Sequence, residues 1–199
     1  MIAIVDYGVG NLHSVLKAVE KSGAKACITS DAKEIGQADK LILPGVGSFG
    51  HCMANLEKFS LSGVVKDYAA SGRPFLGICV GLQILFAESE ESPGIRGLGL
   101  LPGKVRRISG SGLKIPQIGW NSLEICKKTP LFSGLESGEY VYFVHSYYAD
   151  APDDIVTAKV HYGELLTASV QEGNIEAVQF HPEKSGDTGL AMLANFCKE

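Results

Sequence analysis

The segment Gly77-Ile78-Cys79-Val80-Gly81 has the residue types of a nucleophile elbow. Apolar residues before it predict a buried strand over 74–78, and those after it predict a helix over 80–87. Such a turn exposes the nucleophile, and small neighbours are needed because the backbone conformation there is costly. The start of the following helix also favours a thiolate. The alternative is a structural cysteine packed between two glycines, since unpaired cysteine is often buried.

A candidate base lies more than 100 residues downstream. His181 and Glu183 flank Pro182 and follow an apolar strand predicted over 176–180. A thiol nucleophile needs a base that takes its proton and returns it to the leaving group, and that base needs an acceptor that orients it. The three side chains therefore predict a catalytic triad of Cys79, His181 and Glu183. The alternative for His181 is a half-exposed residue in a capping turn.

A third candidate is the loop Pro44-Gly45-Val46-Gly47, which follows a strand predicted over 41–43. Ligands of open α/β sheets bind outside the carboxyl ends of the strands, so this loop should face Cys79. Its backbone N–H groups can approach a substrate oxyanion closely because glycine carries no side chain. By itself the loop is equally typical of an ordinary strand-to-helix turn.

The elements that must position these residues alternate in the first half of the chain. Strands are expected over 2–5, 25–29, 41–43 and 74–78, and helices over 12–19, 49–59 and 61–70. Strands separated by helices imply right-handed crossovers and a parallel sheet covered on both faces.

The second half has shorter, more antiparallel strand patterns. These strands are expected over 104–108, 123–126, 140–144, 155–160, 166–170 and 176–180. A last helix over 189–197 is expected to bury Leu190, Leu193, Ala194 and Phe196. We therefore expect one α/β domain over residues 1–199, flavodoxin-like, with a mostly parallel central sheet and a smaller antiparallel sheet region.

Composition excludes several classes of protein. The 199 residues include 18 Lys and Arg against 22 Asp and Glu, a net charge of −4. A nucleic-acid groove or an anionic membrane surface would need a basic footprint, which this balance argues against. The 45% of hydrophobic residues is enough for a core, and the 20% of charged residues is far from the disordered regime.

The cysteine pattern and the N-terminus point to the cytoplasm. Five scattered cysteines without a CxxC pair fit neither a zinc site nor a disulfide framework. The first residues lack the basic start of a signal peptide, and the longest uncharged stretch, 74–87, is shorter than the ~18 residues of a membrane span. We expect a cytoplasmic protein with free thiols, no metal and no cofactor.

Two motifs resemble a known family. Gly-Ile-Cys-Val-Gly-Leu-Gln at 77–83 and His-Pro-Glu-Lys-Ser at 181–185 resemble the class I (triad) glutamine amidotransferases. Four further stretches, at 6–12, 44–49, 119–121 and 142–148, are similar to the glutaminase subunits of imidazole glycerol phosphate synthase. The resemblance runs from Ile2 to the last helix. The glutaminase of pyridoxal phosphate synthase is similar in length, but its characteristic opening and Gly-Gly-Glu-Ser loop do not occur in this sequence.

The resemblance implies a role for each matched residue. Cys79 would attack the side-chain amide carbon of glutamine, His181 would transfer protons, and Glu183 would orient His181. The residues implied for the oxyanion and for glutamine are Val46, Gly47, Val80, Gln83, Ser146 and Tyr147. Gln117 stands where many members of the family have His, so the resemblance does not extend to a role that needs an imidazole at 117.

The resemblance also implies a partner. The ammonia would pass to a (β/α)8 cyclase subunit of imidazole glycerol phosphate synthase in a heterodimer. The cyclase would make imidazole glycerol phosphate and aminoimidazole carboxamide ribotide, in histidine biosynthesis. Trp120 and the aromatic residues over 140–148 suit either an interface or a core. Lys184 is expected on the partner's side, and His145 is expected to anchor a core or loop rather than to act as a base.

Two other classes remain open at this point. A flavodoxin-like redox or stress protein can also carry a reactive cysteine after a parallel strand, but it would need neither Gln83 nor a His–Pro–Glu sequence late in the chain. An inactive scaffold is disfavoured because all three residues of the triad are present. Selective labelling of Cys79 by a glutamine-like electrophile would separate these alternatives.

Overall fold

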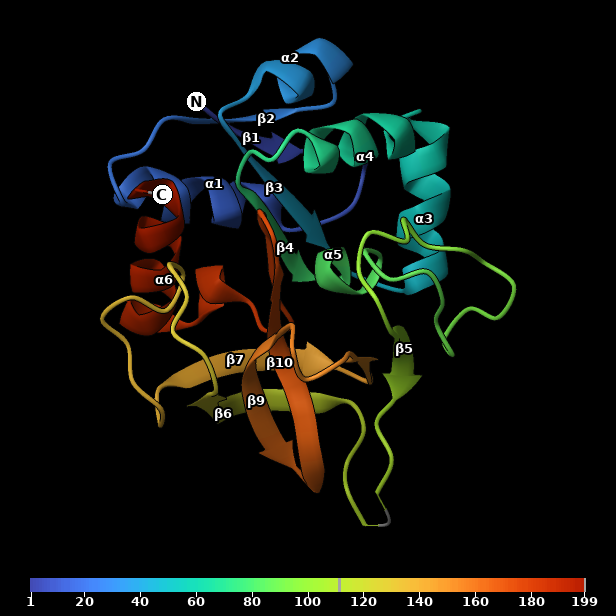
Figure 1. The fold of residues 1–199 in the computed structure, drawn as a ribbon, viewed down its shortest axis with the longest axis vertical. Coiled ribbons are helices and arrows are strands. Elements are labelled where there is room, and N and C mark those ends of the chain that lie inside the picture. Colours follow the sequence, from blue (N-terminus) through green and yellow to red (C-terminus); the bar gives the residue numbers. More distant parts are fainter. Residues whose placement is uncertain (111, 199) are drawn as a thin grey trace.

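A nine-stranded sheet dominates the computed structural model, which describes residues 1–110 and 112–198 (Figure 1). Ser111 and Glu199, which the expected domain 1–199 includes, lie outside the described residues. Five neighbouring strands are parallel, in the order β2 (Ala26–Thr29), β1 (Ile2–Val5), β3 (Lys40–Gly45), β4 (Phe75–Cys79) and β11 (Ile175–Val178).

Antiparallel strands continue the same sheet beyond β11. They are β10 (Glu164–Glu172), β9 (Val156–Tyr162), β6 (Gln117–Ile125) and β7 (Tyr140–His145). A separate two-stranded sheet pairs β5 (Lys104–Arg107) with β8 (Tyr147–Asp150). The expected α/β class is confirmed, and the antiparallel strands extend the central sheet as well as forming the small second sheet.

The helices form two packed groups around the parallel strands (Figure 1). They are α1 (Leu12–Lys21), α2 (Ala32–Gln37), α3 (Phe49–Lys58), α4 (Ser62–Ala70), α5 (Val80–Gln83) and α6 (Gly186–Lys198), with a 3₁₀ turn, η1 (Pro182–Lys184), before α6. Helix α1 contacts α6, whereas α4 contacts both α2 and α3. Strands β1, β4 and β11 are buried along their whole length, as expected of parallel strands covered on both faces.

The helix expected over 80–87 is wrong in its length, because α5 ends at Gln83. The carbonyl oxygens of Ile84 and Leu85 accept hydrogen bonds from the backbone N–H groups of Leu98 and Leu100. A helix cannot continue where its carbonyls bond to another segment instead of to the next turn. This diversion folds residues 97–101 back against the end of α5.

Apart from shifts of a few residues at the ends of elements, three other elements were missed or begin far from the predicted position. Helix α2 has no counterpart there, because it is one and a half turns long and buries only Ile35, which gives no helical period. Strand β8 has none either, because its four residues do not alternate. Strand β6 begins at Gln117 rather than at 123, because Ile118 and Trp120 place apolar side chains on its exposed face and mask the alternation.

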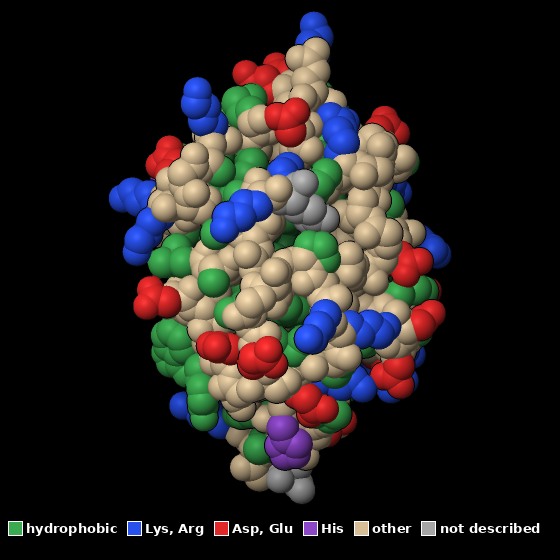
Figure 2. Space-filling view, turned by 60° about the vertical axis from the view of Figure 1, so that its left-hand side comes forward, with side chains coloured by type: hydrophobic (Ala, Val, Ile, Leu, Met, Phe, Trp, Pro, Cys, Tyr) green, Lys and Arg blue, Asp and Glu red, His purple; other side chains and the backbone are tan. Residues whose placement is uncertain are grey.

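The surface carries charges of both signs. Figure 2 shows acidic and basic side chains interspersed over the face in view, without a region of one sign. This agrees with the small net charge of −4. Among the described residues, no helix is both long and apolar enough to cross a membrane. All five cysteines are unbridged.

Candidate active site

The carboxyl ends of β3, β4 and β11 meet at one edge of the sheet. In the register of these strands Gly45 lies beside Cys79, and Ile78 lies beside Val178. The loop after β3, Cys79 at the end of β4 and His181 just after β11 therefore come together, as the sequence predicts. They border a cavity of about 390 Å³.

Cys79 sits in a strained turn between β4 and α5. Its backbone has φ +57° and ψ −114°, a region that non-glycine residues rarely adopt and that costs on the order of 1–3 kcal/mol. The flanking glycines are required by close packing. A β-carbon at Gly81 would lie 2.0 Å from the carbonyl oxygen of Leu43, and one at Gly77 would lie 3.0 Å from the β-carbon of Ala177. Only glycine lets the elbow lie this close to β3 and β11.

His181 and Glu183 form a buried pair behind the cysteine. His181 is 2% exposed, and its Nδ1 lies 2.8 Å from Oε1 of Glu183. The backbone of His181 is fixed on both sides, because its N–H donates to Tyr142 and its carbonyl accepts from the Ser185 hydroxyl. Burial lowers the pKa of His181, but the neighbouring Cys79 and Glu183 side chains outweigh it and raise the pKa to about 9. The imidazole is therefore held in the geometry that a base for Cys79 requires.

The raised pKa of His181 links folding to pH. Its ordinary pKa is 6.5 and its pKa in the folded protein is about 9, so the folded state binds the proton more tightly. The resulting stabilisation is complete below the unfolded-state pKa and is lost as the pH rises through about 9. Glu183→Gln removes the carboxylate that favours the charged ring. We expect the free energy of unfolding, measured in urea, to fall more steeply between these two pH values in the wild type than in Glu183→Gln. Equal slopes would contradict this assignment.

Hydrogen bonds from Tyr7 and Cys52 fix the end of β3 and the residues after it. The Tyr7 hydroxyl donates to the Pro44 carbonyl at 2.6 Å, and the Cys52 thiol donates to the Val46 carbonyl at 3.4 Å. In a trans peptide the C=O and N–H point in opposite directions, so the N–H of Gly47 points away from Cys52 and α3. Gly47 has φ +87°, a conformation that favours glycine. Val46, Gly47 and Val80 all line the cavity.

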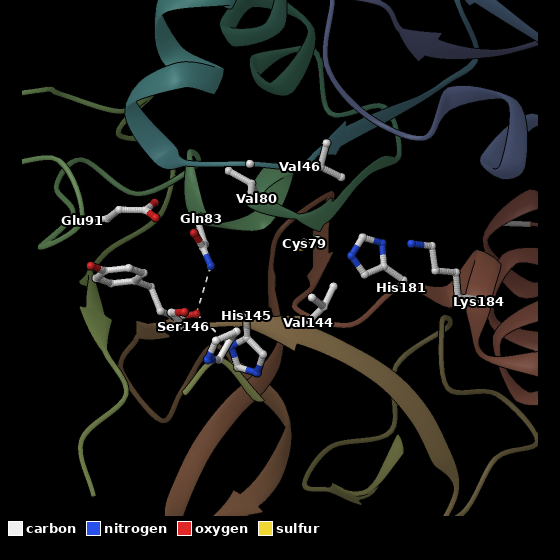
Figure 3. Close-up of a pocket in the computed structure, with 13 residues that line it drawn as sticks. Val46, Cys79, Val80, Gln83, Glu91, Val144, His145, Ser146, His181 and Lys184 are labelled. Carbon is white, nitrogen blue, oxygen red and sulfur yellow. Dashed lines mark hydrogen bonds between the residues drawn. The ribbon is translucent and has the colours of Figure 1, made fainter. Parts of the chain in front are cut away.

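The opposite wall carries the residues expected to contact glutamine. Gln83 on α5, Ser146 between β7 and β8, and Tyr147 at the start of β8 line the cavity. Figure 3 labels Gln83 and Ser146. The amide nitrogen of Gln83 donates to the Tyr147 carbonyl and to Oε1 of Gln179, each at 3.0 Å. Both N–H bonds of Gln83 are thus used within the protein, and its oxygen is the group that it can offer to a ligand.

All the sequence-predicted site residues except Glu183 line this cavity, and Glu183 lies behind His181. The cavity also contains residues that sequence reasoning did not place there, namely Glu91, Pro116, Val144, His145 and Lys184. Glu91 is the notable omission. Its Oε2 accepts the N–H of Phe49 at the start of α3, at 2.7 Å. In the sequence it belongs to an acidic run over 88–91, which is typical of a solvated surface.

His145 is an anchoring residue, as expected from the sequence. It is 5% exposed, and its Nδ1 and Nε2 lie 2.9 Å from the Tyr147 carbonyl and the Gln117 amide. Burial lowers its pKa to about 4, so it is neutral at physiological pH. Within the described part of the chain, no cluster of three or more His, Cys, Asp or Glu residues has an arrangement that could hold a metal ion.

Comparison with known families and sequences agrees with this geometry. Residues 3–199 match the model of the family "Glutamine amidotransferase class-I". The chain is 53% identical over 198 residues to imidazole glycerol phosphate synthase subunit HisH of Methanothermobacter thermautotrophicus, covering 98% of this chain and 97% of that protein. It is 50% identical to HisH of Syntrophotalea carbinolica, covering 98% of each chain.

Solved structures share the fold at lower sequence identity. PurLQS from Thermotoga maritima superposes with a TM-score of 0.78 at 22% identity, covering 99% of this chain and 97% of that one. The glutaminase domain of CTPS from Trypanosoma brucei has a TM-score of 0.67 at 17% identity, covering 100% and 94% of the two chains.

Proposed function

Because the chain belongs to the class-I glutamine amidotransferases, and within them to the HisH subunits of imidazole glycerol phosphate synthase, we propose that Cys79, His181 and Glu183 hydrolyse glutamine in the cavity at the sheet edge. The observation that carries this assignment is the buried His181, whose Nδ1 bonds to Glu183 and whose ring lines the same cavity as Cys79. The family activity is that of a glutaminase subunit in histidine biosynthesis.

The groups of the site divide the steps of the reaction between them. The thiol of Cys79 gives its proton to His181, and Sγ attacks the side-chain amide carbon of glutamine. The carbonyl oxygen becomes an oxyanion that backbone N–H groups of Val80 and of the Val46–Gly47 segment stabilise. Protonated His181 gives its proton to the leaving nitrogen, so ammonia departs and a glutamyl thioester remains. His181 then takes a proton from water, whose oxygen attacks the thioester. The C–S bond breaks, glutamate leaves, and His181 returns the proton to the sulfur of Cys79.

A glutamine-like electrophile tests the assignment of the nucleophile. A diazo-ketone analogue of glutamine should label Cys79 alone among the five cysteines, and Cys79→Ala should abolish labelling. Comparable labelling of Cys27, Cys52, Cys126 or Cys197 would contradict a reactive elbow. The same experiment separates a glutaminase from a general redox cysteine, which would react without any need for the glutamine backbone.

The charge of Glu91 supports a specific orientation of glutamine. The α-ammonium group of the substrate needs acceptors, and the carboxylate of Glu91 and the amide oxygen of Gln83 are the side-chain acceptors offered from this wall of the cavity. Ser146 and Tyr147 line the same cavity. We therefore assign Glu91 to the ammonium group, which leaves the side-chain amide of glutamine to reach Cys79.

Replacing Glu91 with glutamine should weaken substrate binding. Gln at 91 keeps an oxygen for the Phe49 N–H but loses the charge that pairs with the ammonium group. We expect KM for glutamine to rise at least about tenfold with a smaller change in kcat, as for a lost hydrogen bond between charged groups. Steady-state ammonia release measures both constants.

The matched control for that variant is Glu88→Gln. Glu88 is exposed and belongs to the same acidic run, but it does not line the catalytic cavity. Its KM should stay at the wild-type value. An unchanged KM in Glu91→Gln, or an equal rise in both variants, would rule out the assignment of Glu91 to the ammonium group.

The relatives are named as subunits of a synthase, which implies a partner subunit. We propose that the partner is the (β/α)8 cyclase subunit of imidazole glycerol phosphate synthase, bound in a heterodimer. It receives the ammonia and forms imidazole glycerol phosphate and aminoimidazole carboxamide ribotide. The five unbridged cysteines are consistent with a reducing, cytoplasmic location.

The exposed face of β6 and β7 is the surface that we assign to the cyclase. This β6–β7 face consists of Ile118, Trp120, Tyr140, Tyr142 and Val144, which pair across the two strands or alternate along them. Ile118, Trp120 and Tyr140 are each more than half exposed, an unusual density of large apolar side chains for an unpartnered strand pair. Val144 also lines the catalytic cavity, so the face is continuous with the site that releases ammonia.

Trp120→Ala should weaken the complex. Trp120 is 55% exposed and packs edge-on against Tyr142, as expected of an aromatic anchor at an interface. We expect the Kd for the cognate cyclase subunit, measured by calorimetry, to rise about 30-fold. Leu165→Ala, which truncates an exposed side chain on β10 outside the β6–β7 face, is the control and should leave Kd unchanged. Wild-type affinity in Trp120→Ala would exclude this face as the main contact.

A further inference from the structure

A relay of buried, hydrogen-bonded polar groups connects β6 to Cys79. The Gln117 amide contacts His145, and both His145 and Gln83 contact the Tyr147 carbonyl. Gln83 also donates to Gln179, whose Nε2 lies 3.9 Å from Sγ of Cys79. The side chains of this relay are at most 5% exposed; they are Gln117, His145, Gln83 and Gln179.

The Tyr147 carbonyl fixes the direction of the hydrogen bonds in the relay. A carbonyl only accepts, so His145 must carry its proton on Nδ1 and Gln83 must present its NH₂ group there. The remaining N–H of Gln83 points at Gln179, which can receive it only through Oε1. The amide of Gln179 therefore cannot rotate by 180° without losing that bond, and its NH₂ group must face the sulfur of Cys79.

The same reasoning orients Gln117. His145 is neutral, because burial lowers its pKa to about 4, and its proton is on Nδ1. Its Nε2 is then an acceptor, yet Oε1 of Gln117 lies 2.9 Å from it and Nε2 of Gln117 has no partner. Exchanging the amide oxygen and nitrogen of Gln117 by a 180° rotation gives the ring a donor, and we assign Gln117 that orientation. In this orientation Gln117 donates to His145, and a hydrogen bond to His145 does not require an imidazole at position 117.

We propose that Gln179 is a positioning residue for Cys79, and that the relay Gln117–His145–Tyr147–Gln83 holds its amide with the N–H groups toward Sγ. A neutral donor aimed at the sulfur stabilises a thiolate more than a thiol, since a hydrogen bond to an ion is stronger than one to a neutral group. The relay also ties the nucleophile to Gln83, which contacts the substrate. It begins one residue from Ile118 on the β6–β7 face. This inference rests on the proposed function only for its consequence in catalysis.

Alkylation of Cys79 by iodoacetamide tests the contact without glutamine. Iodoacetamide is small and neutral and needs no glutamine pocket, so its rate reports the reactivity of the thiol itself. Peptide mass spectrometry gives the rate for Cys79 separately from the other four cysteines. We expect Gln179→Met to slow alkylation of Cys79 about tenfold, as for a lost hydrogen bond to a charged group. Gln171→Met, a half-buried change of the same kind on β10 outside the relay, should react at the wild-type rate.

A double-mutant cycle tests the relay. Gln117→Met should slow alkylation of Cys79 about threefold, because His145 and the Tyr147 carbonyl lose one constraint. The double variant Gln117→Met/Gln179→Met should be no slower than Gln179→Met alone, since the contact at the end of the relay is already absent. Effects that multiply would show that Gln117 acts independently of Gln179, and would overturn the relay.

Alkylation rates in Gln179→Met and Gln83→Met decide whether Gln179 positions Cys79. A wild-type alkylation rate in Gln179→Met would overturn the positioning role. If Gln179→Met does not fold, Gln83→Met removes the donor that orients Gln179 and should still slow alkylation about threefold; an unchanged rate there overturns the proposal equally. In steady-state assays Gln179→Met should lower kcat more than it raises KM. A chain that never hydrolyses glutamine, yet shows these alkylation rates, would contradict the proposed function and leave the relay standing.

Discussion

Cys79→Ala is expected to lower glutamine hydrolysis by about four orders of magnitude or more, because removal of a covalent nucleophile leaves only binding and oxyanion stabilisation. The variant should still fold, since Cys79 is 3% exposed and alanine relieves rather than adds bulk in a strained turn. Ammonia release in the presence of the cyclase measures the loss, and circular dichroism checks the fold.

The control for this variant is Cys126→Ala. Cys126 is exposed just beyond the end of β6 and does not line the catalytic cavity. Its activity should equal that of the wild type. Substantial glutaminase activity in Cys79→Ala would mean that the chemistry occurs elsewhere, whatever the geometry of the elbow.

His181→Ala is expected to cause a loss of similar size, about 10³- to 10⁴-fold, because the variant lacks the imidazole that takes the proton from Cys79 and delivers it to ammonia. Cys79 and His181 act as one unit, so their effects should not add. The double variant Cys79→Ala/His181→Ala should be about as slow as Cys79→Ala alone.

The neighbouring histidine provides the control for His181. His145 lines the same cavity, but its pKa is lowered to about 4 and both ring nitrogens are engaged. His145→Gln should therefore retain far more activity than His181→Ala. If the effects of Cys79→Ala and His181→Ala multiplied, or if His145→Gln were as slow as His181→Ala, the base would be misassigned.

The parallel sheet and the grouping of Cys79, His181 and Glu183 at its edge could be predicted because their signals are local. Cys79 follows a buried apolar strand and lies between Gly77 and Gly81, which the close approach of Ala177 and Leu43 requires. His181 and Glu183 follow another apolar strand that pairs in parallel with β4. Since parallel strands align their carboxyl ends, the sequence alone brings these residues to one edge.

Other site residues depend on packing between distant segments and carry no local signal. Glu91 reaches the cavity only because its loop caps the start of α3. Gln179 is a polar residue within a buried stretch, and only its contacts with Gln83 and Cys79 give it a role. The length of α5 is likewise set by residues 97–101, which take over the carbonyls that would have continued the helix.

Direct detection of the glutamyl thioester tests most closely whether Cys79 is the covalent nucleophile. The protein, bound to its cyclase subunit, is mixed with isotopically labelled glutamine, quenched in acid during turnover and digested for mass spectrometry. Covalent catalysis by Cys79 requires a labelled glutamyl group on the peptide that carries Cys79, and none on peptides that carry the other four cysteines. Turnover of glutamine with no adduct on Cys79, or with the adduct on another residue, would contradict it.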